Sequence, residues 1–389
     1  MRKKIKVAIA GVGNCASALI QGIQYYNSNH SGDIVTNNTN DKNKNKNIEN
    51  QNDSSLTDNA HSTTDDFIGL TSLNIGGYEP GDIEFVAAFD VTDTKVGMDL
   101  SKAIFAPPNN AIKIMDIPSF DVKVQKGDVL DGIGKHYSEI VKINDNTSVD
   151  IVKTLKDVNA DILVNYLPVG SREATRNYAE KCLEAGVSFI NAIPVFIASD
   201  PKWQNRFIEK NIPCAGDDVM SQLGATVVHK TLAKLWVDRG VMIDETYQLN
   251  VGGDMDFYNM LDEERLEDKR VSKTSAVKAM VPYDIPMRIG PSDYVSFLKN
   301  DKVCYIYMKG RFFGKVPVEL DLKIRVPDAY NSSGVMIDAI RASKIALDRG
   351  IAGPLESISA FCFKHPPIQM PYSQAKSNFL EFVDGKRDR

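Results

Sequence analysis

The first half of the chain alternates short apolar runs with amphipathic stretches. Aliphatic runs recur at residues 5–10, 83–91, 160–168 and 187–194. Runs of this length with little polar alternation are typical of strands buried on both faces of a parallel sheet. Helical patterns lie between them, at residues 16–26 and at 171–186, where Ser171 is the expected N-cap and Gly186 the stop. Strand and helix in this order predict a parallel sheet with right-handed crossovers.

The pattern changes after Gly216. Residues 221–240 predict a long helix that ends at Gly240. Residues 316–326 then alternate strictly between apolar and charged side chains, which is typical of a long half-buried strand in an open, mixed or antiparallel sheet. Residues 334–353 return to a helical pattern.

We therefore predict an α/β protein with a Rossmann-like doubly wound parallel sheet and an inserted α+β domain that carries a large open sheet. The sheet domain would comprise residues 1–216 and 332–389, and the inserted domain residues 217–331. Residues 27–66 are dominated by Asn, Asp, Ser, Thr and Lys. They contain too little apolar surface to offset the entropy of ordering, so we predict a disordered surface insertion there.

Composition excludes several classes of protein. The 389 residues have 43% hydrophobic and 25% charged side chains, the balance of a globular protein. A net charge of -5 argues against nucleic-acid and membrane-surface partners. No apolar run approaches the roughly 20 residues of a membrane-spanning helix, and the run near the N-terminus is too short for a signal peptide. The five cysteines form no CxxC pair, which favours a reduced, cytoplasmic protein.

A glycine-rich turn links the first predicted strand to the first predicted helix. The segment from Gly11 to Ala16 has the sequence GVGNCA and fits the GxGxxA pattern of dinucleotide-binding proteins. The first glycine permits the tight turn, and Gly13 lets the backbone approach a pyrophosphate at the helix N-terminus. Asp90 ends the second strand and is the expected partner of the adenosine ribose, which favours NAD over NADP. The alternative is that Asp90 only caps its loop.

Lysines and aspartates elsewhere form a second candidate site. Lys269 and Lys273 are four residues apart, so on a helix they share one face, and Lys364 lies between an aromatic run and two prolines. Asp217 and Asp218 precede the long helix, where carboxylates favour the helix dipole. Lysines that converge on one pocket would bind phosphate, stabilise oxyanions and lower the pKa of one lysine until it can act as a base. The alternatives are solvated lysines and helix-capping aspartates.

Longer motifs point to a known family. VAIAGVGNCASALIQG, DGIGKHY, YLPVGS, FINAIPVFIASDP, GDDVMSQLGAT, LNVGGDMDFYNM, SKTSAV, IGPSDY and KHPP occur in this order. Together they resemble the prokaryotic type of myo-inositol-1-phosphate synthase, also called inositol-3-phosphate synthase. The resemblance implies an isomerase with catalytic NAD. It would oxidise glucose 6-phosphate at carbon 5, enolise it at carbon 6, close the ring onto carbon 1 and reduce the product again, with no net redox change.

The resemblance also assigns roles to individual residues. It implies catalytic roles for Lys269, Lys273, Lys302, Lys364 and Asp256, with Lys315 as the alternative to Lys302. It implies cofactor-binding roles for Gly11, Gly13, Asn14, Cys15, Ala16, Asp90, Leu167, Pro168, Asn191, Asp218, Ser221 and Asp338. It implies substrate-binding roles for Asn250, Lys269, Lys273 and Lys364.

Three further points depend on the resemblance. Asp254 and Met255 stand where the family has an amide pair, which leaves individual cofactor contacts open. Some prokaryotic members require a divalent metal ion, but the five histidines here have no metal-ligand spacing, so a metal remains an open question. The family's middle-domain sheet forms tetramer contacts, which implies a homo-oligomer, with a tetramer expected.

Two other functions remain as alternatives. A plain NAD-dependent dehydrogenase of a small polar substrate would produce net NADH, whereas the synthase would not. A catalytically inactive NAD-binding regulatory protein would not need the lysines, so alanine at Lys273 would leave its function unchanged.

Overall fold

The computed structural model describes residues 4–30 and 67–389. Most of the predicted insertion, residues 31–66, therefore lies outside the described residues, and so does His61. Residues 27–30 are described and form the last turn of helix α1 (Asn14–His30). The prediction that the disordered insertion begins at residue 27 is therefore wrong for these four residues.

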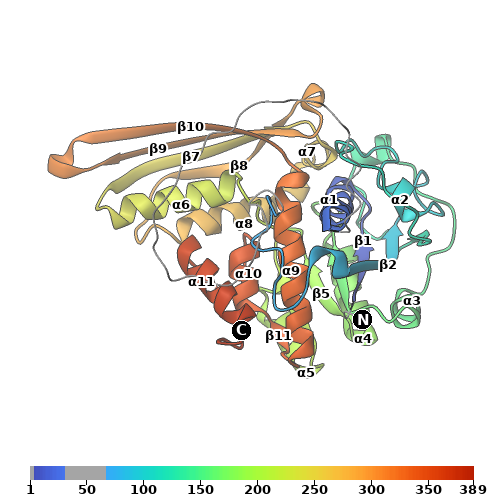
Figure 1. The fold of residues 1–389 in the computed structure, drawn as a ribbon. Helices are drawn as coiled ribbons and strands as arrows, with labels where there is room; N and C mark the ends of the chain where they lie inside the picture. Colours follow the sequence, from blue (N-terminus) through green and yellow to red (C-terminus); the bar gives the residue numbers. More distant parts are fainter. Residues whose placement is uncertain (1–3, 31–66) are drawn as a thin grey trace, which may run out of the picture.

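The larger sheet has seven strands in the order β11-β6-β5-β4-β1-β2-β3 (Figure 1). Its strands are β1 (Ile5–Ala10), β2 (Ile83–Asp90), β3 (Val124–Lys126), β4 (Ile162–Asn165), β5 (Ser188–Asn191), β6 (Pro213–Gly216) and β11 (Gly353–Pro354). All its neighbouring strands are parallel. The order 3-2-1-4-5-6 within this sheet is that of a doubly wound dinucleotide-binding fold, which confirms the predicted fold class.

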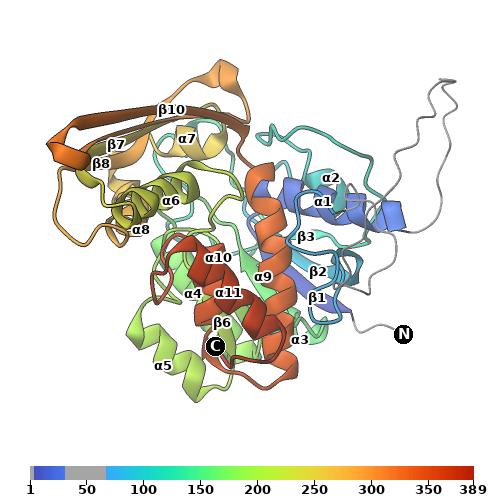
Figure 2. The same cartoon turned by 60° about the vertical axis from the view of Figure 1, so that its left-hand side comes forward.

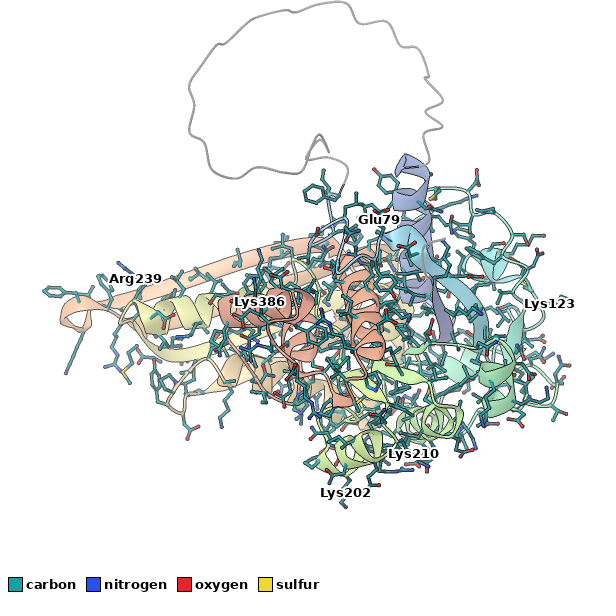
Figure 3. All side chains as sticks on the ribbon, turned by 60° about the horizontal axis from the view of Figure 1, so that its bottom comes forward. Glu79, Lys123, Lys202, Lys210, Arg239 and Lys386 are labelled. Atoms are coloured by element: carbon teal, nitrogen blue, oxygen red, sulfur yellow. The ribbon has the colours of Figure 1, made fainter. Side chains whose placement is uncertain are left out.

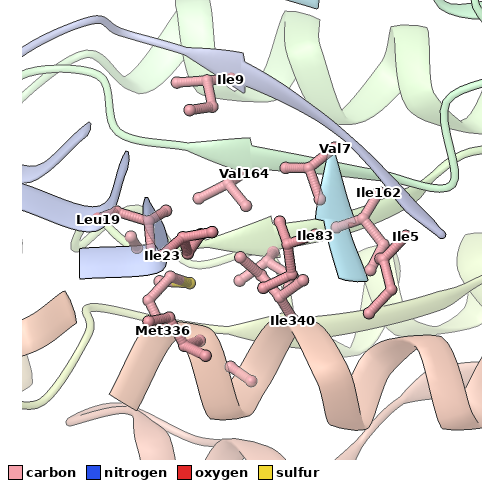
Figure 4. Packing of buried hydrophobic residues seen from close by; sticks show 14 of the residues in the cluster. Ile5, Val7, Ile9, Leu19, Ile23, Ile83, Ile162, Val164, Met336 and Ile340 are labelled. Carbon is pink, nitrogen blue, oxygen red and sulfur yellow. The ribbon is translucent and has the colours of Figure 1, made fainter. Parts of the chain in front are cut away.

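Helices cover both faces of this sheet. The helices are α1, α2 (Leu100–Ala103), α3 (Ile151–Asp157), α4 (Arg172–Ala185), α5 (Pro201–Glu209), α9 (Tyr330–Asp348), α10 (Glu356–Cys362) and α11 (Tyr372–Val383). On one face, Leu19 of α1 and Met336 of α9 belong to the same buried cluster as Val7 of β1 (Figure 4). On the other, Tyr178 of α4 packs with Ala8 and its neighbours. Because β1 is buried on both faces, its residues are aliphatic except for the half-buried Lys6.

The second sheet has the order β10-β9-β7-β8 and mixed pairing. Its elements are β7 (Met242–Gly252), β8 (Met287–Tyr294), β9 (Asp301–Arg311) and β10 (Pro317–Pro327), with helices α6 (Ala225–Asp238), α7 (Met255–Asn259) and α8 (Glu267–Lys278). β9 is antiparallel to β7 and β10, whereas β7 and β8 are parallel. The long strand predicted at 316–326 is β10, and its apolar residues Leu320, Leu322 and Ile324 pack toward α6 and α8.

The chain returns to the parallel sheet after β10. Helix α9 crosses the sheet, and α10 and α11 lie beside it (Figures 1 and 2). The division into domains, with residues 217–331 inserted into the sheet domain, stays a prediction. The helix predicted at 221–240 is shorter than expected, because α6 begins only at Ala225, after the N-cap Gly224. No helix in the described part of the chain is long and apolar enough to cross a bilayer.

Candidate active site

The glycine-rich turn has the geometry of an anion-binding turn. Gly11 has a φ of 91°, and a Cβ there would lie 2.5 Å from the carbonyl oxygen of Tyr166, so glycine is required. At Gly13 a Cβ would meet no described atom within 4 Å. Because α1 begins at Asn14, the open space beside Gly13 lies at a helix N-terminus, where backbone N–H groups favour an anion.

Asp90 holds this turn together. Its carboxylate accepts hydrogen bonds from the backbone N–H groups of Val12 (2.9 Å), Val91 (2.8 Å) and Thr92 (2.9 Å), and Lys95 Nζ lies 3.8 Å away. Burial alone would raise the pKa of Asp90, but Lys95 and these hydrogen bonds lower it, so the group stays ionised. The carboxylate caps its loop and also lines the cavity described next. The two interpretations of Asp90 are therefore compatible.

A cavity opens at the carboxyl ends of the parallel strands, next to the second domain. Its lining includes thirteen of the residues that the sequence singles out: Gly11, Gly13, Asn14, Cys15, Asp90, Leu167, Pro168, Asp218, Ser221, Asp256, Lys269, Lys302 and Lys364. The cavity lies where the chain leaves β1 and β4, the neighbouring strands at which a doubly wound sheet reverses its strand order. Ligands bind at this point in such folds.

Three lysines at the cavity are each paired with one aspartate. The pairs are Lys269–Asp256 (2.7 Å), Lys364–Asp218 (2.9 Å) and Lys302–Asp328 (3.0 Å). Lys269 is on α8, Lys302 is on β9 and Lys364 follows α10. Lysines such as Lys123 and Lys202 instead lie exposed at the periphery of the molecule (Figure 3). The alternative of solvated lysines is therefore wrong for these three.

Lys273 differs from the three paired lysines. It follows Lys269 by one turn of α8 and is 2% exposed. Its side-chain amine forms no hydrogen bond or ion pair with any residue that the structure describes, and the described cavity lining does not include Lys273. Burial lowers the pKa of Lys273 well below its usual range, and the ammonium groups of Lys302, Lys269 and Lys364 lower it further, against the opposing charge of Asp218. Burial and the ammonium groups of Lys269 and Lys302 also lower the pKa of Lys364, but Asp218 opposes that shift through a direct ion pair. Lys273 has no such pair, and its pKa is lowered well below the usual range.

Asp218 connects two parts of the site. Its carboxylate accepts hydrogen bonds from Lys364 Nζ and from Ser272 Oγ (2.7 Å) on α8. Burial opposes its ionisation, but Lys364 and Lys269 lower the pKa of Asp218. The capping role that we considered for Asp217 and Asp218 is wrong, because Gly224 is the N-cap of α6. Asp217 is instead buried and accepts hydrogen bonds from the Ile197 and Ser199 backbone.

Two aspartates at the cavity were not predicted to have a role. Asp328 pairs with Lys302, because the β9–β10 register places Lys302 opposite Val326, two residues before Asp328. Asp254 caps α7 by accepting a hydrogen bond from Phe257 N (3.0 Å). Burial, together with the charges of Asp328 and Asp256, raises the pKa of Asp254 to about 7. A hairpin register could have indicated Asp328, whereas nothing in the sequence indicated the environment of Asp254.

Some predicted residues lie behind the cavity rather than on it. Asn191 Nδ2 donates to Asp217 Oδ1 (2.7 Å), and its side chain is buried between strands. Asn250 is buried on β7 and donates to Gly290 O (2.8 Å). Ala16 is buried in the core beneath the glycine turn. The cavity lining, as far as it is described, does not include these three residues.

Asp338 and Lys315 also lie away from the cavity lining. Asp338 is buried on α9, where it pairs with Arg341 (2.5 Å) and accepts hydrogen bonds from the backbone and hydroxyl of Thr71. Lys315 lies in the exposed turn between β9 and β10. Of the two alternative lysines, the structure therefore places Lys302 at the cavity and Lys315 far along the hairpin.

The residues present fit a dinucleotide better than a metal ion. The open space beside Gly13 would receive a pyrophosphate, and Asp90 lies at the end of the neighbouring strand. The hydroxyl of Tyr166, a cavity-lining residue, is buried and has no hydrogen-bond partner among the described residues. Within those same residues, no group of three or more His, Cys, Asp or Glu side chains is placed to hold a metal ion.

Comparisons with known proteins agree with this geometry. A family model described as myo-inositol-1-phosphate synthase matches residues 224–329. The inositol-3-phosphate synthase of Mycolicibacterium smegmatis is 48% identical, over 98% of this chain and 98% of the relative. That of Corynebacterium glutamicum is 46% identical, over 97% and 98% respectively. The crystal structure of inositol-3-phosphate synthase from Caenorhabditis elegans superposes with a TM-score of 0.72 over 98% of this chain and 86% of that one. At 14% identity it supports the fold alone.

Proposed function

Because the chain belongs to the inositol-3-phosphate synthase family, we propose that its buried lysine cluster carries out the proton transfers and anion binding of that reaction. The activity converts glucose 6-phosphate to myo-inositol 3-phosphate. The single observation that supports this assignment of roles is the arrangement of the four lysines. Three are paired with aspartates, and two of these, Lys269 and Lys302, have raised pKa values; the amine of the fourth, Lys273, is buried without a partner among the described residues.

Family membership implies NAD as the cofactor. When bound, NAD supplies the reversible hydride acceptor for carbon 5 of the substrate. We propose that the glycine turn at Gly11 and Gly13 receives its pyrophosphate and that Asp90 accepts hydrogen bonds from its ribose hydroxyls. Leu167 and Pro168, which follow β4, would line the same groove. No metal-dependent step is proposed, because the described residues offer no set of metal ligands.

We propose that Lys273 Nζ moves the proton in the steps that need a base. A neutral amine accepts a proton, whereas an ammonium group does not, and the environment of Lys273 favours the neutral form. Oxidation at carbon 5 releases a hydroxyl proton, and enolisation releases a proton from carbon 6. Both protons leave before ring closure and both return: one goes to the carbon 1 oxygen when the ring closes, and the other goes to the carbon 5 oxygen in the final reduction.

The paired lysines have the complementary role in this proposal. Burial opposes the charge of Lys269, but Asp256 and Asp218 raise the pKa of its amine, so Lys269 stays an ammonium group. Asp328 does the same for Lys302. Fixed positive charges in a cavity shielded from water stabilise the substrate phosphate and the enolate oxygen more strongly than they would in water. Each aspartate holds its lysine in position. Because an ammonium group has three N–H donors, the remaining donors stay available to bind the substrate.

The experiment that tests the proposed function measures product and redox balance together. Pure protein incubated with glucose 6-phosphate and NAD is expected to form inositol phosphate while the absorbance of NADH returns to its starting value. Accumulation of NADH in step with substrate loss, without inositol phosphate, would support the plain dehydrogenase instead. No change of either species with protein that binds NAD would support the inactive regulatory protein.

We propose that residues 217–331 also form the oligomer contact of a homotetramer, inserted into an NAD-binding domain of residues 1–216 and 332–389. The outward face of the second sheet carries Tyr247, Leu249 and Tyr305, which are 37%, 39% and 43% exposed. Tyr247 also stacks on Tyr307, with ring centroids 5.0 Å apart. On β10 the same face carries charged side chains, such as Lys323 over the Tyr305 ring. Exposed aromatic residues among charged ones on an open sheet are typical of a protein interface. Tyr305→Glu is expected to lower the mass measured by light scattering.

A further inference from the structure

Arg265 connects the helix that carries two of the lysines to loops of the parallel-sheet domain. It ends the short turn η3 (Glu263–Arg265), two residues before α8 begins. Its guanidinium donates from Nε to Val169 O (2.9 Å), from Nη1 to Asp131 O (3.0 Å) and from Nη2 to Ser171 Oγ (3.3 Å). These acceptors come from two separate loops of the parallel-sheet domain. A single side chain therefore holds both loops against the start of α8.

The two loops have glycines where Arg265 packs. A Cβ at Gly170 would lie 2.6 Å from Arg265 Cβ, and one at Gly134 would lie 2.7 Å from Arg265 Cδ. Gly170 also has a φ of 87°, which residues with a side chain rarely adopt. The close approach of the arginine thus depends on the absence of side chains at both positions.

These loops also form part of the cavity wall. Gly132 and Val169 line the cavity. Gly132 follows Asp131 in one loop, and Val169, in the other loop, accepts the hydrogen bond from Arg265 Nε. Asn259 Nδ2 donates to the same Val169 oxygen (2.8 Å). The junction therefore joins the cavity wall on the sheet side to the segment that leads into the lysine helix.

A second contact fastens the same end of α8. Arg172, at the start of α4, donates from Nε to Asp268 Oδ2 (2.6 Å), and Asp268 immediately precedes Lys269. Arg172 is more than one-third exposed, so this ion pair is screened by solvent and contributes less than the enclosed contacts of Arg265.

We propose that Arg265 is a positioning residue for the reaction, which fixes α8 against the loops of the cofactor domain and so sets where Lys269 and Lys273 lie relative to bound cofactor and substrate. This inference rests on the proposed function of those lysines. Arg265 itself touches loops and is not proposed to contact substrate. The planar guanidinium of Arg265 donates hydrogen bonds to three acceptors at once. The ammonium group of a lysine, on a flexible side chain, cannot reproduce this geometry.

The test compares Arg265→Lys with the wild type in four measurements: thermal unfolding, NAD affinity by titration, the substrate KM, and the pH dependence of kcat. A displacement of about 1 Å of a reacting group lowers rates by on the order of 100-fold. We expect kcat to fall by on the order of 10- to 100-fold, while NAD affinity and KM change by less than about threefold. Arg176→Lys is the matched control, because Arg176 is exposed on α4 and pairs within its own helix with Glu173.

The pH profile separates positioning from general destabilisation. The charged groups that face Lys273 are Lys302, Lys364 and Asp218 from other segments and Lys269 from its own helix. If α8 moves away from Lys302 and Lys364, their ammonium groups repel the protonated Lys273 less and its pKa rises. The acid limb of kcat is therefore expected to shift to higher pH in Arg265→Lys. A variant that is only less stable would keep the wild-type limb.

The outcomes are distinct. An unchanged kcat and an unchanged acid limb in folded Arg265→Lys would overturn this inference, while the proposed function would stand if Lys273→Met is inactive. Full activity of Lys273→Met would instead overturn the proposed function. If Arg265→Lys does not fold, Asp268→Asn weakens the same junction and is expected to shift both readouts in the same direction; no shift in that variant would overturn the inference.

Discussion

Replacing Lys273 by methionine removes the unpaired amine and keeps an apolar stem of similar length. A positioned acid–base group contributes about 10²- to 10⁴-fold to a rate. We therefore expect Lys273→Met to lower kcat for inositol phosphate formation by at least about 100-fold. NAD affinity is expected to stay within a few fold of the wild type, because the glycine turn and Asp90 belong to other segments.

Lys273→Met also has an expected effect on folding. The pKa of Lys273 is well below its ordinary value of 10.5 in the folded protein, so the unfolded chain binds more protons between those two pKa values. Stability of the ligand-free wild type therefore rises with pH in that window, by up to about 1.4 kcal/mol per pH unit for this group. Lys273→Met loses this rise, and near neutral pH it is expected to be as stable as the wild type or more so, because no buried amine is left without a partner.

The assay measures inositol phosphate formation and urea unfolding at several pH values. Lys230→Met is the matched control: Lys230 is 1% exposed on α6, its amine donates to Gln369 Oε1 (3.4 Å), and burial alone lowers its pKa to about 8, with no contribution from the site lysines. It should share the stability effect and keep its activity. Retention of more than about one-tenth of wild-type kcat by Lys273→Met would refute the reasoning, since an acid–base group contributes at least about 100-fold.

Three other substitutions test separate parts of the account. Gly13→Ala is expected to leave the melting temperature unchanged but weaken NAD binding, whereas Gly11→Ala, strained at a φ of 91°, should lose about 1–3 kcal/mol of stability by denaturant unfolding. Asp338→Asn leaves the Arg341 guanidinium buried without its charge partner and should lose about 3–5 kcal/mol, with NAD affinity unchanged by calorimetry. For Asp254, the folded pKa of about 7 exceeds the ordinary value of 3.8, so wild-type stability falls as the pH rises from 4 to 7. Asp254→Asn keeps the N-cap and should flatten that fall in thermal scans.

Much of the fold could be predicted from local patterns. The aliphatic runs predicted the positions of β1, β2, β4 and β5 because strands buried on both faces are mostly apolar. The four-residue spacing of Lys269 and Lys273 predicted that they share one face if their segment is helical, and both lie on helix α8. These features depend on residues close together in the sequence.

What could not be predicted depends on contacts between distant segments. Asp328 reaches Lys302 only through the register of β9 and β10, and its sequence neighbours give no sign of that pairing. The partner of Asp218 is Lys364, 146 residues away, so a helix cap was an equally good interpretation until the two segments were placed side by side. Asp338 was matched to the family by its motif, but its carboxylate contacts Arg341 and Thr71 and lies outside the cavity lining as the structure describes it. A sequence motif does not show which neighbours a side chain contacts.

The central claim is that one buried amine among the site lysines is neutral at the pH of catalysis. Nitrogen-15 NMR of protein labelled at the lysine side chains measures this directly, with Lys273→Met to assign the signal. The account predicts a signal that titrates well below pH 10.5, as expected for a desolvated lysine, and disappears in Lys273→Met. A Lys273 signal that stays protonated up to the ordinary lysine range would contradict it.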